Sequence, residues 1–570
     1  MIRSRALRVL VLALVFNPLY AAPAQVPFDV QPAGMCFRLA KRKLQGRFLH
    51  ITDMHPDPHY SPGASEKSAC HRKKPKKDKT RAGYYGTPFS DCDSPFSLTN
   101  FTLDYLDKKW TDDIDFVIWT GDNARHDNDR RRPRTTDEIY HLNRVMANKM
   151  QEVFLSKGIP VVPSLGNNDV WRKNILMPGP NDITHEYSSI WKAFIPFPSL
   201  QVFQRGAYYS AEVIPDHLAV VSLNTMYFYD SNKAVGGCEF KERDDPGNLQ
   251  LDWLEVQLEM YRQRSMKVWL SGHVPPTPGN YFPECYVRYA EMALRYQDTI
   301  LGHVFGHMNA DHFTLIEARD LDVPLDENSG GYMNGSDPIG PLKKKKDKLY
   351  RELIQDFSAL PKAKHIDHDQ FAVVNVAPSV VPNPYLPSFR IFAYNITGAP
   401  KKYSELSRRK GHGPTLDRKQ ACKKGSAYQE TWWCQLDKPW HSDGDAPSRT
   451  NTLWTPLGYA QYNIRKKRLN GSSKTRKPKF KLEYTTFPVS ALHPPADLVA
   501  SKFKYPIPLR HLPRSLRNST VTESKFAPYQ MRDLTIPAWV ELAQRLARPK
   551  KEAELRRQFK KYMYQGGREG

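Results

Sequence analysis

The sequence predicts an α/β fold, and three observations support that prediction. Short apolar runs rich in β-branched or aromatic residues alternate with longer segments in which apolar residues recur every three or four positions. The first pattern is typical of buried strands and the second of amphipathic helices. Several of the apolar runs are followed at once by Asp, His or Asn. Because open α/β sheets bind ligands at the carboxyl ends of their strands, these residues also predict where a site would lie.

The predicted elements follow one another along most of the chain. Strands are expected at residues 47–52, 115–120, 159–165, 217–223, 266–271, 300–305, 312–317, 371–376 and 389–394. Helices are expected at residues 138–156, 248–264, 287–296 and 537–562. Thr136 and Asp137 could cap the first of these helices, since their side chains accept hydrogen bonds from free backbone amides.

Composition predicts one large domain with additions. The main α/β domain is expected at residues 45–400, with a basic, Gly- and Asp-rich insertion at 320–369. Residues 401–570 are basic and rich in Pro and Trp, and we expect an irregular C-terminal extension there.

The net charge of +24 is concentrated in clusters. They lie at residues 72–77, 130–134, 343–346, 465–468 and 477–479. Such clusters favour a polyanionic partner, and nucleic acid, inorganic polyphosphate and anionic lipid headgroups all meet that description. Any single cluster is also explained by solvated loops.

The N-terminus predicts entry into the secretory pathway. Residues 1–22 contain three arginines, an apolar run at 9–16 and then small residues, which is the layout of a signal peptide or signal-anchor. A cleaved signal is favoured, because a membrane-spanning helix needs roughly 20 apolar residues. Five sequons predict glycosylation at Asn100, Asn334, Asn395, Asn470 and Asn518.

Cysteine usage is consistent with an oxidising compartment. The chain has seven cysteines and no CxxC spacing, which makes a zinc ribbon improbable. Sequence neighbours could pair as 70–92, 238–285 and 422–434, leaving Cys36 over, although sequence alone leaves other connectivities open.

The residues that follow the apolar runs form a candidate metal-binding set. They are Asp53, His55, Asp122, Asn167, His273, His307 and Asn309. A carboxylate can bridge two cations, and mixed imidazole and oxygen ligands suit Zn, Mn, Fe or Co better than Ca. The set therefore predicts a hydrolase with two divalent metal ions, for which Mg is a further possibility.

In order and spacing these segments resemble the signature of the calcineurin-like metallophosphoesterase superfamily, D-x-H, GD, GNH[DE], H and GHxH, over residues 47–395. The resemblance implies a β-sandwich flanked by helices and a water molecule activated by two metals. It also implies that Asp53 and His55 bind the first metal, that Asp122 bridges both, and that Asn167, His273 and His307 bind the second.

Two positions depart from that signature, with Asn168 and Asn309 standing where it has histidines. Asn309 could still bind a metal through its amide oxygen, whereas Asn168 cannot donate a proton as an imidazolium does. We expect His126 to take over that catalytic role. In acid-sphingomyelinase-like members of the superfamily, a histidine at a similar place contacts the reacting phosphate.

Four further residues near this segment are predicted to bind substrate or to orient the ligands. Arg125 and Arg130 are candidates for binding substrate phosphates. Asp127 and Asp169 are expected to orient ligands rather than to bind metal.

Within the superfamily, Gly166-Asn-Asn-Asp169, the segment from Gly306 to Phe313 and the Lys-rich interruptions are similar to the fungal endopolyphosphatases. That resemblance implies internal cleavage of inorganic polyphosphate in the vacuole by a glycoprotein, with N-terminal membrane association and proteolytic maturation by a processing protease. It implies no sequence-specific nucleic acid partner. Two alternatives remain, a secreted acid-sphingomyelinase-like phosphodiesterase and a non-catalytic polyanion-binding protein.

Overall fold

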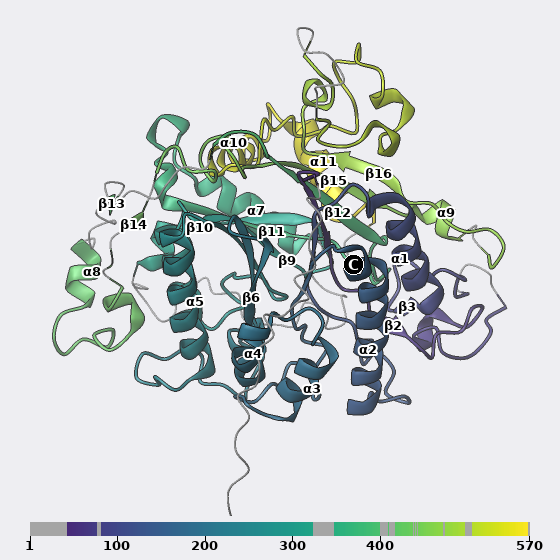
Figure 1. The fold of residues 1–570 in the computed structure, drawn as a ribbon, viewed down its shortest axis with the longest axis horizontal. Helices are drawn as coiled ribbons and strands as arrows, with labels where there is room; N and C mark the ends of the chain where they lie inside the picture. The colour runs from purple at the N-terminus through teal and green to yellow at the C-terminus, as the bar shows by residue number, and fades with distance from the viewer. Residues whose placement is uncertain are drawn as a thin grey trace, which may run out of the picture. The chain divides into compact units, whose positions relative to one another are not determined.

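Two mixed six-stranded sheets form the centre of the protein in the computed structural model (Figure 1). The structure describes residues 43–76, 81–322, 347–399, 408–409, 416–436, 438, 440–441, 443–470, 473–495 and 504–567. The predicted signal at 1–22, the sequon at Asn334 and the basic cluster at 343–346 lie outside these residues. From Leu44 onward, the described residues belong to one compact unit.

The first sheet has the strand order β16-β15-β12-β1-β4-β5. Its strands are β1 (Arg47–Ile51), β4 (Phe116–Trp119), β5 (Val161–Pro163), β12 (Ser388–Tyr394), β15 (Pro456–Asn463) and β16 (Lys481–Thr485). The half formed by β1, β4 and β5 is parallel, whereas β12, β15 and β16 are added to it antiparallel. All residues of β1 and β4 are buried, as expected for parallel strands covered on both faces.

The second sheet has the order β10-β11-β9-β8-β7-β6. Its strands are β6 (Tyr209–Ile214), β7 (Leu218–Ser222), β8 (Lys267–Ser271), β9 (Ile300–Phe305), β10 (His312–Glu317) and β11 (Phe371–Val376). The four strands β7, β8, β9 and β11 run parallel, and β6 and β10 close the two edges antiparallel.

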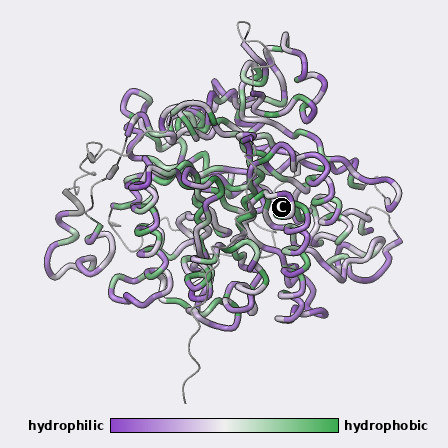
Figure 2. Tube along the Cα trace, viewed as in Figure 1, coloured by the Kyte–Doolittle hydropathy of each residue, from purple (hydrophilic) through white to green (hydrophobic). Residues whose placement is uncertain are grey.

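The two sheets pack face to face as a sandwich. The ring of Phe48 in β1 lies 4.9 Å from that of Trp269 in β8. The hydroxyl of Ser164, which directly follows β5 of the first sheet, lies 3.0 Å from the hydroxyl of Ser222, the last residue of β7 in the second sheet. Figure 2 shows hydrophobic segments concentrated along the central strands and hydrophilic segments around them. This arrangement confirms the predicted helix-flanked sandwich.

Helices cover the outer faces of the sandwich. They are α1 (Phe96–Trp110), α2 (Thr136–Val153), α3 (Asp182–Ile190), α4 (Leu200–Gly206), α5 (Pro246–Gln263), α6 (Pro283–Arg295), α7 (Lys348–Ala359), α8 (Leu416–Ala421), α9 (Lys466–Asn470), α10 (Ile536–Leu546) and α11 (Ala553–Met563). Helix α1 packs on the first sheet, where Trp110 contacts Tyr462 of β15, and α5 and α6 pack on the second. Two pairs of short strands lie outside both sheets: β2 (Pro56–Asp57) with β3 (Ser94–Pro95), and β13 (Arg408–Arg409) with β14 (Trp440–His441).

The structure confirms all nine predicted strands and three of the four predicted helices. The fourth prediction, a continuous helix at 537–562, is wrong. Helices α10 and α11 are separate there, and Pro549 lies between them, because a proline cannot continue the backbone hydrogen bonding of a helix. Helices α1, α3 and α4 and strand β6 were not predicted.

The C-terminal region is less irregular than the sequence predicts. It supplies β15 and β16, and the side chain of Gln565 accepts a bond from the backbone amide of Leu386 and donates to Ser388. Within the expected insertion at 320–369, residues 348–359 form α7, whose Phe357 stacks 4.9 Å from Phe313 of β10. The domain boundary proposed at residue 400 stays a prediction, although strands from both sides of it share the first sheet.

Three disulfides confirm the predicted pairing of sequence neighbours. They join Cys70 to Cys92, Cys238 to Cys285 and Cys422 to Cys434. Disulfides persist in oxidising compartments, and they indicate passage through the secretory pathway. Among the described residues, no helix combines the length and apolarity needed to cross a membrane.

Candidate metal centre

The predicted ligands lie at one end of the sandwich, in the turns that follow the parallel strands. Asp53 and His55 follow β1, Asp122 follows β4, His273 follows β8 and His307 follows β9. Except for His273, each of these residues has a positive φ, between 39° and 70°. Such left-handed backbone is costly for non-glycine residues and is concentrated at functional sites.

Glycines beside the ligands allow the strand ends to approach one another. A Cβ atom on Gly166 would lie 2.1 Å from Oδ1 of Asp122, and one on Gly306 would lie 2.6 Å from Oδ2 of Asp53. Neither distance is sterically possible, so any larger residue at either position would displace a ligand turn.

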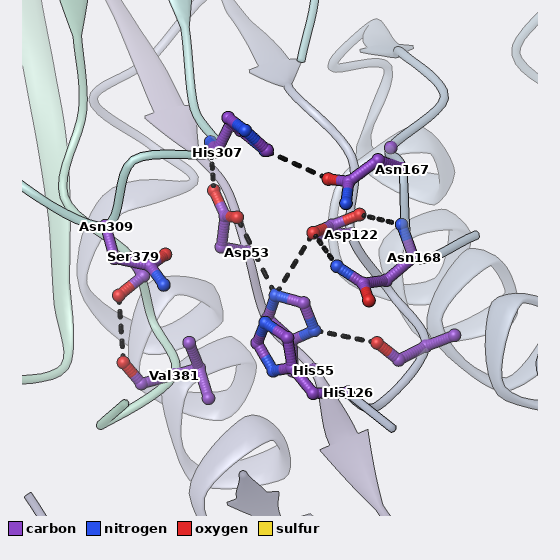
Figure 3. Close-up of polar contacts among 12 residues, drawn as sticks. Asp53, His55, Asp122, His126, Asn167, Asn168, His307, Asn309, Ser379 and Val381 are labelled. Atoms are coloured by element: carbon purple, nitrogen blue, oxygen red, sulfur yellow. Dashed lines mark hydrogen bonds and ion pairs between the residues drawn. The ribbon is translucent and has the colours of Figure 1, made fainter. Parts of the chain in front are cut away.

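The first group of ligands surrounds the carboxylate of Asp122 (Figure 3). His55 Nε2 lies 3.3 Å from Asp122 Oδ2 and 3.7 Å from Asp53 Oδ1. All three side chains are buried. Two carboxylates thus lie beside one imidazole. This combination of oxygen and nitrogen donors suits a divalent transition metal.

The second group comes mainly from the second sheet. His273 Nε2 lies 3.2 Å from Asp122 Oδ2 and 2.8 Å from Asn167 Oδ1. His307 Nδ1 lies 2.9 Å from the same amide oxygen and 3.3 Å from His273 Nε2. Burial lowers the pKa of His273, but Asp122 and Asp53 outweigh it and raise the pKa to about 9. A field that draws a proton to this imidazole would also draw a cation.

Asp122 is the member that the two groups share. Candidate ligand atoms of Asp53, Asp122 and His273 lie within 4.8 Å of one another, and those of His55, Asp122 and His126 do so as well. A shared carboxylate is the geometry expected for a bridge between two cations.

The hydrogen bonding of the ligands also fits bound metal. The ring Nδ1–H of His55 donates to the carbonyl of Ala124 at 2.7 Å, and that of His273 donates to the carbonyl of Thr120 at 2.7 Å. These bonds leave the Nε2 lone pairs directed at the carboxylates, as in metal-binding histidines. Nε2 of His55 and Oδ1 of Asp53 are buried and make no hydrogen bond, a costly state that coordination would relieve.

The two asparagines that depart from the superfamily signature differ in their contacts. Asn168 holds Asp122 in place, since its backbone amide donates to Oδ1 and its side-chain amide to Oδ2, both at 2.8 Å. Asn309 donates its Nδ2 to the carbonyl of Asn383 at 2.9 Å, while its Oδ1 is buried without a hydrogen bond. Figure 3 places Asn309 beyond Asp53, on the side of Ser379 and Val381. Its amide oxygen is thus available for a cation.

Asp169 supports the bridging aspartate from behind. Its carboxylate accepts bonds from the backbone amides of Asp122 and Asn123 and from the side chain of Asn143. Burial, followed by the charge of Asp122, raises the pKa of Asp169. These contacts are those of an orienting residue, as the sequence suggested.

His126 lies against the ligands, as expected. Its ring stacks on that of His55, with centroids 3.9 Å apart. Asp93, which sequence reasoning missed, fixes this histidine by accepting bonds from its backbone amide at 2.6 Å and from ring Nδ1 at 2.7 Å. Burial lowers the pKa of His126, and the neighbouring His55 lowers it further. One feature of the sequence could have pointed to Asp93: it follows Cys92, whose disulfide with Cys70 fixes this loop.

The two arginines predicted to bind substrate lie in different environments. The guanidinium of Arg125 is buried, and Nε and Nη2 donate to the carboxylate of Glu138 at 2.5 and 3.1 Å. This ion pair occupies two groups of N–H donors, and phosphate binding by Arg125 stays a prediction. Arg130 is exposed in the loop after β4 and stays a candidate. Arg134 is buried behind the site, where its Nη1 donates to the carbonyl of Asn168 at 2.6 Å.

The predicted glycosylation sites vary in exposure. Asn100 in α1 and Asn518 are exposed, and Asn395 is half-buried. Asn470 ends α9. Glycosylation at these positions stays a prediction.

Comparison with known proteins agrees with this geometry. The profile of the calcineurin-like phosphoesterase family matches residues 46–310. An endopolyphosphatase of Cryptococcus neoformans is 40% identical, over 90% of this chain and 90% of that protein. Endopolyphosphatases of Schizosaccharomyces pombe and Yarrowia lipolytica are 33% and 39% identical, over 89% and 63% of this chain and 84% and 57% of those proteins. The chain therefore belongs to the endopolyphosphatase family and carries a calcineurin-like phosphoesterase domain.

Proposed function

We propose that this protein is an endopolyphosphatase that hydrolyses phosphoanhydride bonds inside chains of inorganic polyphosphate. The observation that carries the proposal is the buried carboxylate of Asp122, shared by two groups of ligands in a chain of this family. Polyphosphate has one negative charge or more on each unit, and a net charge of +24 favours its approach.

Two divalent cations would be held by the residues described above. Asp53, His55 and Asp122 are assigned to one cation and Asp122, Asn167, His273 and His307 to the other, with Asn309 as an additional oxygen donor. When bound, such cations polarise a phosphoryl oxygen and lower the pKa of water toward neutrality. Zn, Mn, Fe, Co and Mg are all compatible with mixed imidazole and oxygen donors.

The residues around the ligands have separate roles in this proposal. Asn168 fixes the orientation of Asp122 through two hydrogen bonds, one from its backbone amide and one from its side-chain amide. In its imidazolium form His126, whose Nδ1–H donates to Asp93, is assigned as the proton donor to the departing phosphate oxygen through Nε2–H. Because burial and His55 lower the pKa of His126, this role requires an acidic pH. A phosphate leaving group needs less protonation than an alkoxide, so one such donor is sufficient.

The same family resemblance supports a vacuolar location for the protein. The disulfides agree with the secretory route that leads there. We further propose association with the vacuolar membrane through residues 1–22 and cleavage by a processing protease. The partner is polyphosphate, and no specific nucleic acid is proposed.

One observation favours the phosphodiesterase alternative. In the loop after the GNND segment, Trp171 and Met177 are 38% and 59% exposed, which could suit a lipid substrate. The same loop also exposes Arg172, which suits a polyanion equally well.

The decisive experiment follows the products of long-chain polyphosphate over time, with and without a chelator. We expect chains of intermediate length before orthophosphate accumulates, and we expect the chelator to stop the reaction. A phosphodiester and sphingomyelin serve as competing substrates. Release of orthophosphate alone would refute internal cleavage, faster hydrolysis of sphingomyelin would favour the phosphodiesterase, and tight polyphosphate binding without turnover would identify a non-catalytic protein.

The role of Asp93 has its own experiment. Asp93→Asn should lower kcat about 10–100-fold because His126 loses its orientation, with little change in KM or in bound metal. Metal content separates the two possible roles of His126, since a proton donor can be replaced without loss of metal and a ligand cannot. Loss of a metal ion in His126→Gln would assign it as a ligand.

A further inference from the structure

The hairpin between β15 and β16 carries an unusual concentration of positive charge. Residues 465–481 include no Asp or Glu. They include nine cationic residues, Arg465, Lys466, Lys467, Arg468, Lys474, Arg476, Lys477, Lys479 and Lys481. We call the described part of this segment, residues 465–470 and 473–481, the cationic hairpin.

Its charges are exposed and close to one another. All nine side chains are exposed. Four lie at residues 465–468, at the start of α9, four lie at residues 474–479, and Lys481 begins β16. Partial burial and then the charges of Arg468, Lys479 and Arg465 lower the pKa of Lys481. These three cations therefore lie near enough to Lys481 to disfavour its charged form, although burial is the larger cause of the shift.

Three of these charges have no carboxylate partner in the part of the chain that the structure describes. Within the described residues, Lys467, Lys477 and Lys479 make no ion pair with Asp or Glu. The contrast with α5 and α6 is clear, since Arg262 there pairs with Asp298 and Arg288 with Asp252. Uncompensated repulsion of this kind destabilises a folded protein, and a polyanionic ligand would relieve it.

The cationic hairpin has a firm base in the core. Leu469 and Phe480 are buried. The ring of Phe480 lies 4.9 Å from Phe389 of β12 and 5.9 Å from Phe101 of α1. The charged side chains therefore project from a fixed platform.

A series of contacts through intermediate residues links the cationic hairpin to the candidate metal centre. Lys466 Nζ lies 4.7 Å from the centroid of the Phe89 ring, and the backbone amide of Phe89 donates to the carbonyl of Pro384 at 3.0 Å. The preceding residue, Asn383, accepts the bond from Asn309 and donates to Asp93 at 3.5 Å. Three contacts thus connect the hairpin to residues at the centre.

We propose that the cationic hairpin is a second binding site, which holds a segment of the polyphosphate chain distant from the bond being cleaved. This inference rests on the proposed function and deepens it. A chain bound at two places gains affinity, because the second contact is intramolecular. Holding the chain away from its cleaved bond also favours substrates long enough to reach both sites, which is the requirement for internal cleavage.

The test compares two triple variants that each remove three exposed lysines. Lys467→Gln/Lys477→Gln/Lys479→Gln changes the cationic hairpin, and Lys419→Gln/Lys423→Gln/Lys424→Gln changes the region of α8, which Figure 1 shows at the opposite end of the view. For each variant, kcat/KM is measured with long-chain polyphosphate and with a short oligophosphate. We expect the ratio of the two values to fall about tenfold in the hairpin variant alone, and its dependence on salt to weaken.

Binding is measured separately from cleavage, by displacement of long-chain polyphosphate from each protein. Both series are repeated with Asn470→Gln, because a glycan on that sequon would stand beside the lysines. Equal ratios in the two triple variants, or unchanged binding by the hairpin variant, would overturn the inference. Loss of binding to phosphatidylserine vesicles with polyphosphate binding unchanged would overturn it in favour of a membrane contact. If the wild-type protein cleaves no polyphosphate, the proposed function fails, whereas the binding comparison still decides on the hairpin.

Discussion

The two sheets contribute different chemistry to the metal centre. The first sheet supplies both carboxylates, one imidazole and an amide, through Asp53, Asp122, His55 and Asn167. The second sheet supplies the imidazoles of His273 and His307. Neither sheet alone has the donors for two cations, so the candidate metal centre forms only where the ends of the two sheets meet. The proposed function would consequently depend on the packing of the sandwich as much as on any single turn.

The strongest test of this comparison is the residue that serves both groups. Asp122→Asn should lower polyphosphate cleavage about a thousandfold or more, because the bridge is worth several kcal/mol of charge stabilisation. The bound metal should fall in parallel, as measured by elemental analysis. Asp216→Asn is a matched control. Asp216 also has a positive φ of 60°, but its side chain is exposed and pairs with Arg264 instead of with a candidate ligand. Retained activity in Asp122→Asn would contradict the metal assignment.

The second prediction asks whether the two sheets act as one unit. Asp53→Asn and His273→Gln each remove a ligand from a different sheet, and each should cost about a hundredfold in activity. The double variant should be little worse than the poorer single variant, because residues of one functional unit are strongly non-additive. His217→Gln, in the exposed turn between β6 and β7, is the control. Losses that multiply would mean that the two groups of ligands work independently.

A smaller effect is expected at the turn after β9. Asn309→Ala should weaken metal binding only about tenfold, because an amide oxygen is a weaker donor than an imidazole or a carboxylate. Asn309→His should bind metal at least as tightly as the wild type, since it restores the donor of the superfamily signature. Titration of the metal-free protein with Mn or Zn measures both. A loss in Asn309→Ala as large as that in His273→Gln would make Asn309 a principal ligand.

The smallest effect concerns a link between two loops of the first sheet. Both ring nitrogens of His71 lie 2.8 Å from carboxylates, those of Asp57 and Asp129. Burial lowers the pKa of His71, but Asp57 and Asp129 outweigh it and raise the pKa above its ordinary value. The stabilisation from this charged histidine should be complete below about pH 6.5 and should be lost as the pH rises through the higher folded value.

Thermal unfolding of His71→Gln and wild type across this range is the measurement. The difference in Tm should be a degree or two at low pH and should shrink as the pH rises. A difference that grows with pH would show that the neutral imidazole is the stabilising form.

The positions of the candidate ligands at strand ends were predictable because each is encoded locally. An apolar run that ends in Gly-Asp or Gly-His places its polar residue at a strand end whatever the rest of the chain does. The same reasoning gave the nine strands and the three disulfides, whose cysteines are near one another in sequence. It did not predict the ion pair of Arg125, because the partner Glu138 lies on α2 and no pattern in the sequence indicates that contact.

Other parts of the site depend on contacts between distant segments. Asp93 reaches His126 across 33 positions, and Asn383 reaches Asp93 across 290. The C-terminal region gave no strand pattern that was recognised, since β15 and β16 mix polar and aromatic residues such as Gln461 and Tyr462. Their place became clear only because β15 pairs with β12, which lies about 70 residues earlier in the chain, and β16 pairs with β15.

The sequence by itself determined which side chains are offered to the metals and that they stand at strand ends, because hydrophobic periodicity and turn residues act over a few positions. The tertiary structure decided which of those ends meet, which histidine gains a carboxylate partner, and that contacts through intermediate residues link a basic hairpin from the far end of the chain to the centre. Those outcomes depend on the packing of two sheets, and packing is a property of residues far apart in the chain.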